Sequence, residues 1–168
     1  MPLLHTLLHL PARMAYLALS ITALGLLSFG LYLQHGVGLE PCPMCIMQRY
    51  AFLVVALLAL LGGVHGPTRR GSRIYAALIG VAALTGASIA ARQSWMQINP
   101  PLIPECGPGL EFMLESFPLA QALPMIFRGA GDCTVIEWTF LGLSIANWSL
   151  VSFTATVLFA GWMLLRRG

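Results

Sequence analysis

The chain has 168 residues, of which 58% are hydrophobic and only 9% are charged, and its mean hydropathy is +0.80. This composition excludes an ordinary soluble globular domain and indicates a protein embedded in a lipid bilayer. The formal net charge of +3 at pH 7 gives no reason to expect a nucleic-acid partner.

Four apolar runs have the length of a membrane-spanning helix. A run of roughly 20 residues crosses about 30 Å of hydrocarbon, because each helical residue rises about 1.5 Å. The runs cover residues 14–33, 43–64, 74–91 and 147–165. Each contains Gly, Ala, Ser or Thr, as expected where helices pack closely in lipid. The sequence therefore predicts an all-α membrane protein, a single four-transmembrane-helix bundle (residues 1–168) without a second domain.

The first run follows Arg13, as the core of a secretory signal peptide follows a basic segment. Its apolar stretch is longer than the roughly 7–15 residues of such a core, and no small-residue cleavage site follows Leu33. We therefore expect a retained helix.

The first and third connections, about 34–42 and 92–146, lie on the same side of the membrane if the four helices alternate. Within the long third connection, Leu110–Phe127 is apolar but interrupted by acidic residues and prolines, so it is too broken to span. We expect a short amphipathic helix lying in the outer interface. A loop packed over the bundle is the alternative.

The charged residues predict the orientation. The arginines of the N-terminus, the second connection and the C-terminus are Arg13, Arg69, Arg70, Arg73, Arg166 and Arg167. The acidic residues all lie in the first and third connections: Glu40, Glu105, Glu111, Glu115, Asp132 and Glu137. The positive-inside rule then places both termini in the cytoplasm and the cysteines, Cys42, Cys45, Cys106 and Cys133, on the outer side.

Cys42-Pro43-Met44-Cys45 stands at the start of the second run. Pro is favoured at the first helical position, because its missing amide hydrogen would be unpaired there. If Pro43 takes that position, Cys42 is the N-cap, and Cys42, Cys45 and Arg49 share one face at positions i, i+3 and i+7. A helix N-terminus and a guanidinium both favour the thiolate form of cysteine, so the motif indicates a reactive dithiol.

Each of these residues also has a structural interpretation. Arg49 at the edge of the hydrocarbon is a functional candidate by its cost, with snorkelling to outer headgroups as the alternative. Zinc is disfavoured because structural sites pair two short Cys-x-x-Cys units, whereas Cys106 and Cys133 are far apart. Haem attachment requires His after the second cysteine, where Ile46 stands. Two static disulfides remain the main structural alternative.

The two cysteine pairs together predict a path for electrons. Cys106 and Cys133 lie on the long outer loop, where the thiol of a soluble protein can attack. Cys42 and Cys45 lie at the membrane surface, where a quinone can collect electrons. Thiol–disulfide exchange can connect the pairs through a mixed disulfide between the loops.

At these residues the chain resembles the DsbB family of bacterial inner-membrane disulfide-forming proteins. The resemblance extends over the four spans and the following motifs: Pro41-Cys42-Pro43-Met44-Cys45 with Gln48-Arg49, Cys106 with Gly131-Asp132-Cys133, and Trp138-Thr139-Phe140-Leu141-Gly142-Leu143. It implies a thiol:quinone oxidoreductase of the inner membrane that reoxidises a periplasmic DsbA-type thioredoxin-fold protein.

The resemblance also implies a role for each cysteine. Cys106 forms the mixed disulfide with the DsbA-type partner, and Cys133 is released and attacks Cys42. Cys45 then faces ubiquinone as a thiolate, and Arg49 stabilises that charge and the quinone oxygen. Menaquinone is the alternative acceptor.

This chain departs from some family members near the outer end of the third helix, where they have His and this chain has Gln93. Glutamine can donate a hydrogen bond to a quinone carbonyl but cannot relay a proton at neutral pH. Gln97 and Arg92 are further candidates for the rim of a quinone site. His35 is a candidate substitute for the missing histidine, with an ordinary loop histidine as the alternative.

Two other functions compete with this one. A vitamin K epoxide reductase-like enzyme also combines a helix bundle, a Cys-x-x-Cys motif and a loop cysteine pair, but there the loop pair comes first. A structural or adaptor membrane protein with two static disulfides predicts no redox turnover.

Overall fold

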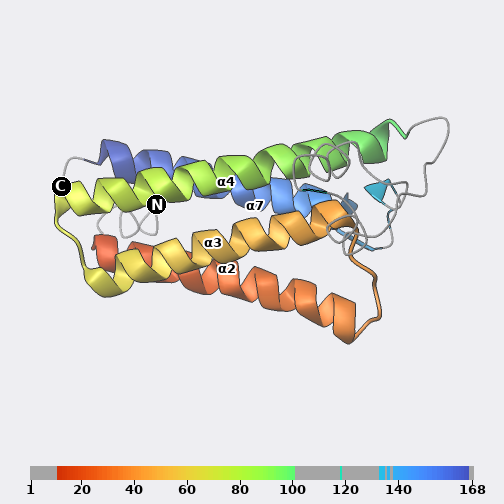
Figure 1. The fold of residues 1–168 in the computed structure, drawn as a ribbon, viewed down its shortest axis with the longest axis horizontal. Helices are drawn as coiled ribbons and strands as arrows, with labels where there is room; N and C mark the ends of the chain where they lie inside the picture. Colours follow the sequence, from red (N-terminus) through yellow and green to blue (C-terminus); the bar gives the residue numbers. More distant parts are fainter. Residues whose placement is uncertain (1–10, 101–117, 119–132, 135, 137, 167–168) are drawn as a thin grey trace.

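The structure is a computed structural model that describes residues 11–100, 118, 133–134, 136 and 138–166. Four helices dominate it, and a short antiparallel hairpin precedes the last of them (Figure 1). Their bounds are α2 (Ala12–His35), α3 (Pro43–His65), α4 (Arg69–Ile98), β1 (Thr139–Phe140), β2 (Leu143–Ser144) and α7 (Ile145–Leu165). All four helices are long and apolar enough to cross a membrane.

The helices run lengthwise beside one another, with α2 packed on α3, α3 on α4, and α4 on α7 (Figure 1). Alanines at the contacts let the backbones approach closely: Ala59, Ala76 and Ala83 are each 0% exposed. Larger apolar side chains such as Ile21 and Leu158 point outward, as they do on a surface that faces lipid. The predicted all-α, four-helix membrane bundle is confirmed.

Helices α3 and α4 are joined by a short turn, and α4 is longer than its apolar run. Helix α3 stops at Gly66, whose φ of 53° is the left-handed conformation common after a helix. Helix α4 then begins at Arg69 and continues to Ile98, well beyond the apolar run 74–91 at both ends. Its last turns mix polar and apolar residues and carry Gln93 and Gln97 on regular helical backbone.

The hairpin β1–β2 was not predicted, because its residues fall inside the long third connection. Thr139 pairs with Ser144 and Phe140 with Leu143. Leu141 and Gly142, between the strands, have φ of 53° and 78°, as the two central residues of a tight hairpin turn require.

Aromatic contacts attach this hairpin to the bundle. Trp148 of α7 donates from Nε1 to the Phe140 carbonyl at 3.0 Å. Trp138 stacks on Phe140 and meets Phe29 of α2 edge-on, with ring centroids 6.1 and 5.7 Å apart. Trp138 and the hairpin therefore contact α2 and α7 at the end of the bundle where Cys42 lies.

The predicted interfacial helix over Leu110–Phe127 lies outside the described residues, with the single exception of Pro118. The same is true of Cys106 and of every acidic residue in the third connection.

Candidate functional site

Cys42 and Cys45 form a close pair at the start of α3. Cys42 is the N-cap, as predicted from Pro43 at the first helical position, and its Sγ accepts a hydrogen bond from the Cys45 amide at 3.4 Å. The two Sγ atoms are 2.9 Å apart. A disulfide can therefore form between them with little movement of the backbone.

Cys133 joins this pair from the far end of the third connection. It is 0% exposed and packs in one cluster with Cys42, Met44, Ile89 and Met96. Hydrogen bonding to the Cys133 sulfur, and then to Cys45, raises the pKa of the Cys42 thiol. The structure thus brings together three of the four predicted cysteines, and Cys106 is outside the described residues.

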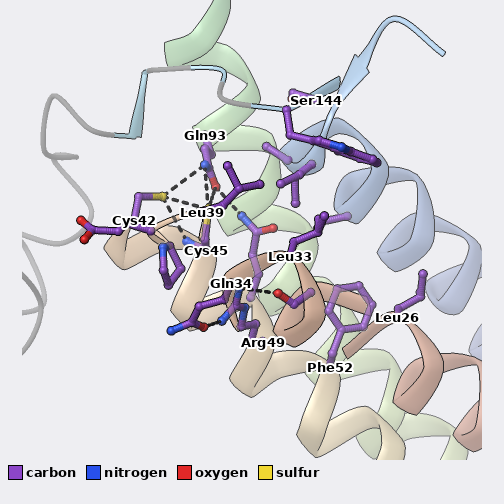
Figure 2. A pocket seen from close by; sticks show the side chains of 18 of the residues that line it. Leu26, Leu33, Gln34, Leu39, Cys42, Cys45, Arg49, Phe52, Gln93 and Ser144 are labelled. Atoms are coloured by element: carbon purple, nitrogen blue, oxygen red, sulfur yellow. Dashed lines mark hydrogen bonds between the residues drawn. The ribbon is translucent and has the colours of Figure 1, made fainter. Parts of the chain in front are cut away.

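Gln93 of α4 faces the cysteine pair across the helix contact (Figure 2). Its Nε2 donates to Cys42 Sγ at 3.3 Å and to Cys45 Sγ at 3.2 Å. Its Oε1 accepts from Nε2 of Gln48 at 2.7 Å. Donors directed at a sulfur stabilise its thiolate form, so Gln93 supports the reduced state of the pair.

Arg49 reaches from α3 towards the last turns of α2. Its Nη1 donates to Gln34 Oε1, and its Nη2 donates to the Gly30 carbonyl at 3.0 Å (Figure 2). The half-buried guanidinium is therefore held inside the bundle by neutral oxygens.

A cavity of about 390 Å³ opens beside these groups, between α2, α3, α4, α7 and the hairpin. Its wall includes five of the predicted site residues: Cys42, Cys45, Arg49, Gln93 and Gln97. Apolar side chains such as Leu26, Phe52 and Trp138 complete it. The volume and the few convergent polar groups are typical of a site for a small, mainly apolar molecule.

Gln97 lies one turn beyond Gln93 and is fixed by the hairpin. Its Oε1 accepts from the Ser144 hydroxyl at 2.6 Å. The same hydroxyl caps α7 by accepting from the Asn147 amide at 3.3 Å. In contrast, His35 and Arg92 are exposed and are not part of the cavity wall.

Gln48 and Gln34 are the site residues that sequence reasoning missed. Gln48 stands three positions after Cys45, on the same helical face, and is 3% exposed. An uncharged polar residue inside an apolar run needs a hydrogen-bond partner, and that signal was available in the sequence. Gln34 was assigned to the first connection, whereas α2 continues through it to His35.

Residues 12–163 match the family model described as disulfide bond formation protein DsbB. The chain is 63% identical over 155 residues to the disulfide bond formation protein B of Azoarcus sp. (strain BH72), covering 92% of this chain and 93% of that one. It is 64% identical to that of Aromatoleum aromaticum over the same shares of the two chains, and 46% identical to that of Hahella chejuensis over 84% and 86%. With a family match that extends along all four helices and relatives this similar, the chain belongs to the DsbB family of disulfide bond formation proteins.

Proposed function

We propose that this protein is a thiol:quinone oxidoreductase that reoxidises a periplasmic DsbA-type dithiol protein and passes two electrons to ubiquinone. The observation that carries the proposal is the Cys42–Cys45 pair, which opens onto a cavity that also contains Arg49 and Gln93. Membership of the DsbB family supports it and leaves the vitamin K epoxide reductase-like alternative without support.

The residues that line the cavity fit a quinone head. Leu26, Phe52 and Trp138 offer apolar surface for a flat ring, and Arg49 and Gln97 offer polar groups for its oxygens. Arg49, Gln93 and Gln97 are the residues that would hold it, and menaquinone fits the same description. A quinone supplies an acceptor of two electrons and two protons.

The protein's own cysteines carry the electrons towards that acceptor by thiol–disulfide exchange. A thiolate of the partner attacks Cys106, forms a mixed disulfide and breaks the Cys106–Cys133 bond. The released Cys133 thiolate attacks Cys42, which breaks the Cys42–Cys45 bond and releases Cys45 as a thiolate. The contact between Cys133 and Cys42 in the structure supports this order.

Two further exchanges complete the relay. The partner's second thiol attacks the mixed disulfide and leaves with its own disulfide formed, so Cys106 is released. The Cys106 thiolate then attacks Cys133 and restores the loop disulfide, which releases Cys42. The net result is a reduced Cys42–Cys45 pair beside the cavity and an oxidised partner.

The proposed location is the bacterial inner membrane. The chain is a multi-pass membrane protein of the DsbB family. Its cysteine end would face the periplasm, where a DsbA-type partner is found, and both termini would lie in the cytoplasm.

A coupled assay tests the function directly. Purified protein is mixed with a reduced DsbA-type partner and a soluble ubiquinone analogue, and quinone absorbance and partner thiols are followed together. We expect one quinone to be consumed for each partner dithiol. A Cys45→Ser variant should reduce no quinone, yet its loop disulfide should still react once with the partner. Quinone consumption at the full rate in that variant would contradict the relay.

A further inference from the structure

Two buried glutamines meet between α3 and α4 next to the cysteine pair. Gln48 and Gln93 are each 3% exposed, and Gln48 Nε2 donates to Gln93 Oε1 at 2.7 Å. The Gln93 NH₂ group lies closer to the sulfurs than the oxygen does: Nε2 donates to Cys42 Sγ at 3.3 Å and to Cys45 Sγ at 3.2 Å, whereas Oε1 accepts from Cys45 Sγ at 3.7 Å (Figure 2).

We propose that Gln48 is a positioning residue: it fixes the carboxamide of Gln93 in the orientation that directs N–H donors at Cys42 and Cys45. This inference deepens the proposed function and rests on it, since it assigns Gln48 a part in setting how readily the cysteine pair accepts electrons.

Shape alone does not select the orientation of the Gln93 carboxamide, because a carboxamide is nearly symmetric. Turning it by half a turn exchanges the oxygen and the NH₂ group with little change in volume. In the turned state, Gln93 would present its oxygen to the sulfurs and would repel a thiolate. Among the described residues, the Gln93 side chain forms hydrogen bonds with the two cysteines and with Gln48. Only Gln48 can engage the oxygen without involving the redox pair.

The geometry of α3 makes Gln48 suited to this part. It is one helical turn after Cys45, so the rigid backbone sets its distance from the pair. Gln93 comes from the neighbouring helix, and the amide–amide hydrogen bond spans the contact between α3 and α4. A buried amide without a hydrogen-bond partner costs free energy, so the hydrogen bond between Gln48 and Gln93 fixes the orientation of both side chains.

The orientation of Gln93 affects the reduction potential of the Cys42–Cys45 pair. Reduction breaks the Cys42–Cys45 bond and adds two electrons, leaving two sulfurs that carry protons or negative charge. N–H donors stabilise negative sulfur more than they stabilise a neutral disulfide, so they favour the reduced state and raise the potential. Loss of the correct Gln93 orientation should therefore make the pair a weaker oxidant.

Two substitutions of similar size separate orientation from mere packing. In Gln48→Glu, measured at a pH where the carboxyl is ionised, the side chain can only accept, so it should turn the Gln93 amide round, and its negative charge adds to the effect by disfavouring a thiolate. In Gln48→Met the partner is lost but no orientation is imposed. Ser20→Ala is the matched control, because it removes a buried hydrogen bond, from Ser20 Oγ to the Ala56 carbonyl at 3.0 Å, that is unrelated to the cysteines.

The full-length protein is prepared without quinone, with Cys106 and Cys133 replaced by Ala, and is equilibrated with reduced and oxidised dithiothreitol. The reduced fraction of Cys42–Cys45 is then trapped by alkylation. For Gln48→Glu we expect the equilibrium constant for reduction to fall about tenfold, the usual weight of a hydrogen bond to a charged group, which is about 30 mV. For Gln48→Met we expect this equilibrium constant to fall by less than for Gln48→Glu. Ser20→Ala should lower the thermal stability of the protein and leave the reduction potential unchanged.

The inference is overturned if Gln48→Met and Gln48→Glu both stay within twofold of the parent, about 9 mV. It is overturned equally if Ser20→Ala shifts the potential as far as they do. If Gln48→Glu does not fold, the Gln48→Met value decides alone by the same limit. No quinone or partner protein is present in this measurement. A negative result for Gln48 therefore does not contradict the proposed relay, and a negative result in the coupled assay does not change the measured potentials.

Discussion

At the cysteine end of the bundle, the hydrogen bonds of the Arg49 guanidinium go to uncharged groups. A charged group in a low-dielectric environment is costly unless it is well paired. The hydrogen bonds of Arg49 within the described residues go to neutral oxygens, those of Gln34 and Gly30, and not to a carboxylate. These contacts hold the guanidinium in place without cancelling its charge, which leaves that charge available to a partly negative group in the cavity.

Removal of this charge should weaken quinone binding more than it weakens folding. For Arg49→Met we expect the apparent quinone KM in the coupled assay to rise about tenfold or more, because a hydrogen bond to a charged group contributes roughly 1.5–3 kcal/mol. The maximal rate at saturating quinone should change less, since the cysteines themselves are intact.

Arg73→Met is the matched control, because Arg73 is exposed near the start of α4, at the other end of the bundle. Its quinone KM should equal that of the parent protein. An unchanged KM in Arg49→Met would show that the guanidinium has no part in holding the quinone.

At the same scale, the sequence predicts local contacts better than contacts between helices. The N-cap position of Cys42 followed from Pro43, because both belong to one turn of chain. The hydrogen bond between Gln48 and Gln93 joins residues 45 positions apart. It depends on how α3 and α4 pack, and that packing has no signature in either segment alone.

Among the helices, a close contact between α4 and α7 depends on the absence of a side chain. Gly86 of α4 faces the ring of Phe153, and a Cβ placed there would lie 2.4 Å from two ring carbons. Phe153 cannot easily move away, because it is 0% exposed and stacks on Phe52 of α3 with ring centroids 4.0 Å apart. Three helices therefore share this one contact.

Gly86→Ala should destabilise the bundle for this reason. Overpacking of a close-packed interior typically costs about 1–3 kcal/mol, which corresponds to a fall of roughly 3–10 °C in apparent melting temperature. The measurement is thermal unfolding of the purified protein in detergent. Gly161→Ala in α7 is the control, because a Cβ there meets no atom within 4 Å and gains the same helix propensity. Equal melting temperatures for the two variants would refute the proposed clash.

The helices themselves could be predicted from the lengths of their apolar runs, and so could the start of α3 at Pro43, but the two ends of α4 could not. Helix α4 begins five residues before the predicted span at Ile74 and ends seven residues after Ala91. Hydropathy identifies the apolar residues of a helix, whereas its backbone hydrogen bonds continue through the polar residues on either side. The hairpin was missed for a different reason: its strands have two residues each, too few for an alternating pattern to be detected.

Over the whole molecule, charge is distributed unequally between the two ends of the bundle. The turn between α3 and α4 is followed by Arg69, Arg70 and Arg73, and Arg13 and Arg166 lie at that same end because the helices alternate in direction (Figure 1). Glu40 precedes α3 at the opposite end, beside the cysteine pair. This difference in charge between the two ends appears only when the four helices are considered together.

The positive-inside rule converts that asymmetry into a testable orientation, with the arginine end in the cytoplasm and the cysteine end in the periplasm. Val37 and Thr68 are exposed in the connections at opposite ends, so Val37→Cys and Thr68→Cys can report on the two sides in a background without the native cysteines. In intact cells, a membrane-impermeant maleimide that reaches the periplasm should label Val37→Cys at once and Thr68→Cys only after the inner membrane is opened. The opposite labelling pattern would place the cysteine pair in the reducing cytosol, where a periplasmic dithiol protein could not reach it and the relay could not operate.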